Sequence, residues 1–175
     1  MRTISLLVAT AAAGLVTLAV AVPAEAVPTT ATLEITAGGL SITAPATAGG
    51  LGTAADSVDG VVISGALGQV QVDDARGAIA GSGWVASVIS TAFTPAPGTA
   101  IAASAVGYTA GLIAKVGTAT YTANDPPNLT GVAPAVTATG ITGDNRATWN
   151  PTISVRVPGG AAVGVYSATI THSVL

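Results

Sequence analysis

The chain contains no cysteine, and only 7% of its 175 residues are charged. Without cysteine it can have no disulfides, no thiolate nucleophile and no lipid on an N-terminal Cys. It has five Lys and Arg residues and a formal net charge of −3, so it lacks the clustered bases that neutralise nucleic-acid phosphates. We therefore expect no nucleic-acid partner, and a fold stabilised by burial and by backbone hydrogen bonds.

The longest apolar run lies at the N-terminus. Arg2 precedes an apolar stretch over 4–22, which ends at the small-x-small sequence 24–26. This pattern is typical of a secretory signal peptide, although the run is almost long enough to be a membrane anchor. The Thr-rich sequence that follows favours cleavage. We expect a signal-peptide helix over 1–26, an exported domain over 27–175 and no membrane anchor after cleavage. Because no sorting signal follows, retention at a cell surface would be non-covalent.

Alternation of apolar and polar residues is the main structural signal in the rest of the chain. It is clearest near the C-terminus, where Ile153, Val155 and Val157 alternate with polar residues, 158–160 breaks the run, and 166–174 alternates again. This period of two predicts strands, and the order strand, turn, strand predicts a hairpin. Similar alternation occurs at 33–42, 69–72, 84–89 and 115–123.

A second hairpin is predicted where Leu33 and Ile35 match Leu40 and Ile42 across a Gly-containing turn. Turn residues recur along the chain, as at 73–77, and no strand–helix–strand alternation occurs. We therefore expect one all-β domain, an antiparallel β-sandwich of roughly eight to ten short strands with no helix after the signal peptide.

Residues able to carry catalysis or bind metal are few. His172 is the sole histidine and lies on the apolar side of the last predicted strand, and the chain has no Gly-x-Ser-x-Gly elbow. Asp73 and Asp74, with Asp56 and Asp59, could offer oxygen ligands to Ca²⁺, but their spacing fits no EF-hand and favours turns. We expect no catalytic residues, no metal and no cofactor, so a hydrolase is the weakest functional hypothesis.

Aromatic residues are also scarce: two Trp, three Tyr and one Phe. Each could anchor the core, or could line a surface groove and stack on the sugar rings of a glycan. Trp149 is a candidate for the second role because it lies between a predicted loop and a predicted strand.

Three segments together resemble the WxL domain of Gram-positive surface proteins: VDDARG, GSGWVASV and the terminal WNPTISVRVPGGAAVGVYSATIT. The resemblance implies a β-sandwich that attaches non-covalently to peptidoglycan. Members of this family carry two Trp-x-Leu motifs. Trp84 matches the first motif, with Ala86 in place of leucine. In the second motif His172 replaces tryptophan and Val174 replaces leucine. The candidate ligand-binding residues are Trp84, Trp149, Tyr166 and His172.

Two functions follow as expectations. The first is a secreted, non-enzymatic cell-envelope protein that associates non-covalently with peptidoglycan or another wall glycan. The alternative is a structural surface subunit that assembles by β-strand addition with copies of itself or with other surface proteins, because the last predicted strand carries no protective charge or proline.

Overall fold

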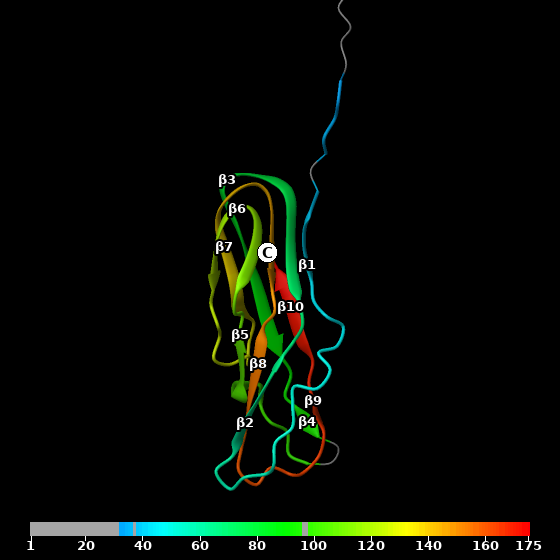
Figure 1. The fold of residues 1–175 in the computed structure, drawn as a ribbon, viewed down its shortest axis with the longest axis vertical. Helices are drawn as coiled ribbons and strands as arrows, with labels where there is room; N and C mark the ends of the chain where they lie inside the picture. Colours follow the sequence, from blue (N-terminus) through cyan, green and yellow to red (C-terminus); the bar gives the residue numbers. More distant parts are fainter. Residues whose placement is uncertain (1–31, 37, 96–97) are drawn as a thin grey trace, which may run out of the picture. The chain divides into compact units, whose positions relative to one another are not determined.

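The computed structural model describes residues 32–36, 38–95 and 98–175 (Figure 1). The predicted signal-peptide helix lies outside these residues. The chain divides into two units, Met1–Glu34 and Ile35–Leu175, and the fold described below is that of the second unit. No helix among the described residues has the length and apolarity needed to cross a membrane.

The second unit is built of β-strands, and its one helical element among the described residues is a single 3-10 turn, η1 (Ala103–Ala105). The strands are β1 (Leu40–Thr43), β2 (Val61–Ala66), β3 (Val70–Ser90), β4 (Thr94–Pro95), β5 (Val106–Thr109), β6 (Ile113–Ala123), β7 (Ala133–Trp149), β8 (Thr152–Val157), β9 (Tyr166–Ser167) and β10 (Ile170–Val174).

The larger sheet, sheet A, has the order β1-β3-β7-β6, and β10 pairs with β3 as well. Strands β3 and β7 form its centre and pair from Val70 opposite Trp149 to Val88 opposite Ala133. The other side of β3 is shared by β1 at its start and by β10, the red arrow of Figure 1, at its end. Strand β6 pairs with β7, and no other described strand pairs with it.

The smaller sheet, sheet B, has the order β2-β8-β5, and a separate two-stranded pair joins β4 and β9. Every strand pair in both sheets is antiparallel. One cluster of buried side chains draws on both sheets, including Val72 and Val136 of sheet A and Ile153 and Val155 of sheet B. The predicted all-β class with antiparallel sheets is confirmed, and the arrangement is consistent with a β-sandwich.

Alternation explains how the central strands supply this cluster. In β3 the buried residues Val70 and Val72 alternate with the partly exposed residues Gln71 and Asp73. The same alternation returns from Trp84 to Ser90. Burying a Val side chain contributes roughly 1.5–3 kcal/mol. The strand therefore keeps one face toward the core at both of its ends.

Both predicted hairpins are wrong. Strand β8 lies between β2 and β5 in sheet B, whereas β10 pairs with β3 in sheet A, so the two C-terminal strands are not partners. Strand β1 likewise pairs with β3, and residues 32–36 belong to no strand. Alternation identifies the faces of a strand but not its partner, because any strand of matching face and length can pair with it.

The turn predicted at 73–77 does not separate two strands. The chain continues through it as part of β3, which has 21 residues, and β7 has 17, so neither is a short strand. The pairing of β3 with β7 shifts register between Asp74 and Ala78 and again before Ser82. Gly77 and Gly81 have positive φ there, as residues at β-bulges often do. The bulges lie where β3 bends over and runs back on itself in Figure 1, so the chain reverses within one continuous strand.

Candidate functional site

Trp84 of β3 lies at the centre of a buried polar network. Its side chain is 2% exposed, and its indole N–H donates to the side-chain oxygen of Asn145 in β7 at 3.1 Å. The Tyr121 hydroxyl of β6 donates to the same oxygen at 3.0 Å, and the Trp84 and Tyr121 rings pack with centroids 5.6 Å apart. Burial, with the charge of Asp74, raises the pKa of Tyr121, so its hydroxyl stays protonated as a donor.

Asp74 extends this network toward the surface. The Asn145 amide donates to one carboxylate oxygen at 3.2 Å, and Arg76 donates to both oxygens from Nε and Nη2 at 2.8 and 2.9 Å. The Arg76 guanidinium holds the pKa of the Asp74 carboxyl below its usual value, although burial acts in the opposite direction. Every polar group of this network has a partner, which is the condition under which a buried carboxylate is tolerated.

The two adjacent aspartates do not face one another. Asp74 points into the core, while Asp73 on the opposite face of β3 pairs with Arg146 and accepts from Gln71 at 2.6 Å. The Arg146 hydrogen bond lowers the pKa of Asp73. Alternation along the strand separates the two carboxylates. Nowhere in the described ranges do three or more acidic or histidine side chains gather closely enough to hold a metal ion.

A second network joins Trp149 to His172. The Trp149 indole N–H donates to the Tyr108 hydroxyl oxygen at 2.7 Å, and this hydroxyl lies 3.3 Å from Nε2 of His172. The tautomer of His172 decides whether Nε2 accepts from the Tyr108 O–H or donates to the Tyr108 oxygen, which has a second lone pair. Burial lowers the pKa of His172 to about 4, and burial also raises the pKa of Tyr108.

The structure thus brings together two of the four candidate binding residues. Trp149 and His172 meet through Tyr108, whereas Trp84 belongs to the Asn145 network. Tyr166 in β9 is half-buried, and its hydroxyl donates to the Ala162 carbonyl at 2.9 Å. Both indoles are 2% exposed, so neither offers an open ring face to a glycan at the surface.

The sequence does not predict Tyr108 and Asn145 as site residues, and it suggests Asp74 only as a possible Ca²⁺ ligand. A signal existed for Asp74, because it continues the alternation of Val70 and Val72 and so falls on the buried face of β3. The sequence distinguishes Tyr108 only as one of six scarce aromatic residues. Asn145 follows Gly143 and Asp144, residue types typical of turns, which the structure places within β7.

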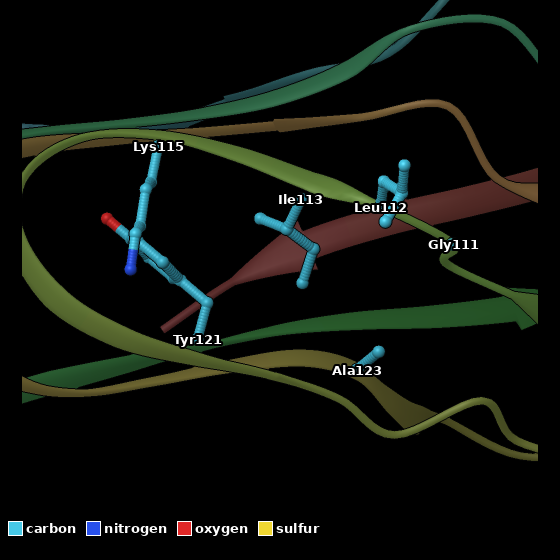
Figure 2. Close-up of a pocket in the computed structure, with 6 residues that line it drawn as sticks. All are labelled: Gly111, Leu112, Ile113, Lys115, Tyr121 and Ala123. Atoms are coloured by element: carbon cyan, nitrogen blue, oxygen red, sulfur yellow. The ribbon is translucent and has the colours of Figure 1, made fainter.

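Two shallow hollows open at the surface. The first, of about 280 Å³, lies beside β6 and is lined by Gly111, Leu112, Ile113, Lys115, Tyr121 and Ala123. Figure 2 shows Lys115 and Tyr121 at one end of this hollow and Gly111 and Leu112 at the other. The strand residues lining it pair with buried residues of β7, so they share the core-facing side of sheet A. A single cation with aliphatic neighbours suits a small acidic side chain better than a large ligand.

The second hollow, of about 300 Å³, lies beside the bulge of β6, near Asp73, Val116 and Arg146. Of its charged groups, Asp73 is paired with Arg146 and Asp74 with Arg76, and the Asp144 carboxylate accepts from the Gly77 N–H at 2.9 Å. A ligand here would have to displace those partners, which leaves little free bonding capacity.

The face of sheet A that points away from the buried cluster carries hydroxyl groups in cross-strand pairs. Thr120 lies opposite Thr139 and Thr122 opposite Thr137 across the β6–β7 ladder. We call this surface the hydroxyl face, made of Thr118, Thr120, Thr122, Thr137, Thr139 and Thr142. Hydroxyls both donate and accept hydrogen bonds, so such a face can bond to sugar hydroxyls without any charge.

Comparison with protein-family models, with curated proteins and with solved structures finds no match to this chain.

Proposed function

We propose that the chain is a secreted, non-enzymatic protein of the cell envelope that associates non-covalently with peptidoglycan or another wall glycan. The observation that carries this proposal is the hydroxyl face, where neutral, paired threonines are displayed on neighbouring strands. The resemblance of the Trp84 segment and of the C-terminal segment to the WxL domain supports the same proposal, as does an all-β fold consistent with a β-sandwich. The glycan would then lie on the hydroxyl face rather than on the indoles.

A non-catalytic role is part of the proposal, and the environment of His172 supports it. The imidazole is half-buried and its Nε2 is occupied by the Tyr108 hydroxyl. With a pKa lowered to about 4, it is a weak base near neutral pH. Its place in the Trp149–Tyr108 network is that of a residue holding the last strand, β10, to the core.

A pair of threonine substitutions tests the wall-binding proposal. Replacing Thr120 and Thr139 by Val removes one cross-strand hydroxyl pair from the hydroxyl face and keeps the β-branched shape. Because each of the two lost hydrogen bonds contributes about 1 kcal/mol, we expect binding to purified peptidoglycan to weaken by about thirtyfold in a sedimentation assay.

The matched control is the Thr109 and Thr152 pair of sheet B, which also lie opposite one another and are exposed. The Thr109→Val, Thr152→Val variant should bind peptidoglycan as the original chain does. If the original chain stays wholly in the supernatant, or if both double variants weaken binding equally, the hydroxyl face does not bind the wall.

A second function, assembly by β-strand addition, is favoured by the free side of β6. This strand has eleven residues, pairs with β7 alone among the described strands and carries one charge, that of Lys115. Natural proteins usually protect such an edge with charges, proline or a covering segment. An uncovered edge of this length is therefore a surface on which another strand can add.

A further inference from the structure

A strand-like segment that pairs with no described strand lies where the chain passes from the first unit to the second, at Glu34 and Ile35. Leu33 and Ile35 alternate with Glu34 and Thr36, the pattern of a strand with one apolar face. Yet residues 32–36 belong to no strand, and the Leu33 and Ile35 side chains are 88% and 87% exposed. Burying two large aliphatic side chains that are exposed to water is favourable. This segment therefore has the composition of a strand that adds to another sheet.

The free side of β6 has a short regular stretch that could receive it. From Ile113 to Val116 the strand pairs with β7 without interruption, and the register first shifts between Val116 and Thr118, where Gly117 has a positive φ of 86°. The bulge ends the regular edge on one side. The accepting stretch, 113–116, is thus as long as the strand-like segment 33–36.

Large apolar side chains are exposed at this stretch and just before it. Val116 is 66% exposed and Leu112, just before the strand, is 95% exposed. Val116 and Ala114 lie on the face opposite to Lys115, because side chains alternate along a strand. The stretch therefore has an apolar face and a face with a single cation.

The charges of the two segments are complementary. Within the described residues the ion pairs are Arg76–Asp74 and Arg146–Asp73, so neither Glu34 nor Lys115 takes part in one. An added antiparallel strand with Glu34 opposite Lys115 places Leu33 beside Val116 and Ile35 beside Ala114. The Glu34 carboxylate then enters the hollow of Figure 2, where the Lys115 ammonium lies. A single register therefore brings the apolar side chains of the two segments together and also pairs their opposite charges.

We propose that residues 33–36 of one copy of the chain add as an antiparallel strand to residues 113–116 of β6 in a second copy, with Glu34 against Lys115. This inference rests on the second proposed function and names its site. An antiparallel strand continues the pairing used throughout both sheets. Each copy carries one donor and one acceptor, so the contact is heterologous and propagates into a linear chain or a ring.

Charge exchange tests the register. The chain is purified after export, with mass spectrometry to establish that 33–36 is retained, and its self-association is measured by sedimentation velocity over a wide range of concentration. Glu34→Lys or Lys115→Glu should each weaken self-association by about tenfold, because an attractive pair becomes a repulsive one. An equimolar mixture of the two single variants should recover association, since opposite charges meet again between unlike copies.

Matched controls carry the same charge changes away from the contact. Asp59→Lys alters an exposed loop acid and Arg156→Glu an exposed base of sheet B, and both should associate as the original chain does. A weakening equal to that of Glu34→Lys or Lys115→Glu would show that net charge alone governs association and would overturn the proposed contact.

Cysteine cross-linking tests the partner, because the chain has no cysteine of its own. A Leu33→Cys, Val116→Cys double variant should form a ladder of covalent multimers on mild oxidation. Covalent closure within single chains would overturn the proposal by showing that the segment adds to its own β6.

Two further outcomes separate the site from the function on which it rests. If the chain remains a monomer at all concentrations and the double cysteine variant cross-links into no multimers, assembly by strand addition itself fails. If multimers form but ignore both charge variants, and the double cysteine variant gives no covalent ladder, assembly survives and this site is wrong.

Discussion

At the scale of single residues, both tryptophans are buried, and the indole N–H of each donates to a polar side chain that the hydrophobic pattern does not predict. Trp84 donates to Asn145, and Trp149 donates to Tyr108. An indole N–H left unpaired in a core would carry the full cost of desolvation, about 1–3 kcal/mol. Asn145 within β7 thus accepts a hydrogen bond from Trp84 and donates one to Asp74, and it does not form a turn.

The other residue-scale question is what His172 contributes. Burial lowers its pKa from an ordinary 6.5 to about 4. Between these values the unfolded chain binds a proton that the folded chain does not, so the stabilisation is fully present above pH 6.5 and is lost as the pH falls. Allowing for partial exposure of the imidazole, we expect the free energy of unfolding to fall by about 2 kcal/mol across this window.

Urea unfolding at a series of pH values, with the original chain beside a His172→Gln variant, measures this contribution. The variant should lose much less stability between about pH 6.5 and pH 4. The two ion-paired carboxylates interfere little, because the pKa values of Asp73 and Asp74 are lowered from 3.8 and their contributions are lost mainly at lower pH. Parallel curves for the two proteins over this window would show that His172 is not the titrating group.

At the scale of elements, the sequence predicts the strands well and their partners badly. The alternation of Ile153, Val155 and Val157 correctly places β8, and that of 166–174 correctly places β9 and β10. Pairing depends on which faces meet in three dimensions, and sheet B takes β8 between β2 and β5. A local turn such as 158–160 therefore does not establish that the strands on either side of it are paired.

The candidate site divides in the same way. Trp84, Trp149 and His172 stand out in the sequence because they are rare residue types, and the structure gives each a polar partner. The sequence does not assign the partners Tyr108 and Asn145, or Asp74 beyond Asn145, because the contacts join strands far apart in the chain. Asn145 of β7 bonds to Asp74 of β3, and Trp149 of sheet A bonds to Tyr108 of sheet B. Register across a sheet is not encoded in local alternation.

The bulge in β6 gives an element-scale prediction. Gly117 has a φ of 86°, and a Cβ there would clash with the Asp144 carbonyl oxygen and press against Asn145. Gly117→Ala should therefore lower the free energy of unfolding by about 2 kcal/mol, through backbone strain and the clash together. Gly140→Ala is the matched control, because Gly140 also has a positive φ, of 63°, but nothing lies within 4 Å of its Cβ position.

Urea unfolding of the two glycine variants separates the causes. The control should lose only about 1 kcal/mol, the cost of the positive φ alone. Equal losses would mean that the close approach of β6 to Asp144 does not constrain the bulge.

At the scale of the whole β-rich unit, no disulfide constrains the chain, so its stability comes from burial and from the sheet ladders. The hydrogen-bonded ladders are unevenly distributed among the strands. Strand β3 is paired on both sides, by β7 and by β1 and β10, and β7 is paired by β3 and β6. Strands β4 and β9 form a separate pair of only two residues each. Opening the centre would break both long ladders, whereas opening the small pair breaks little else.

Hydrogen exchange should reproduce this ranking. Amides of β3 and β7 that bond across the ladder should exchange only on global unfolding, and those of β4 and β9 by local opening at a much lower free energy. In dilute protein the amides of 113–116 that point away from β7 should exchange fast, because no described strand bonds to them. When the concentration is raised, strand addition should protect these amides and those of 33–36, and should leave the free side of β2 unchanged. Equal protection of β4 and β3 would contradict a stability centred on the two long strands, and a rise in protection at β2 instead of β6 would move the assembly edge to sheet B.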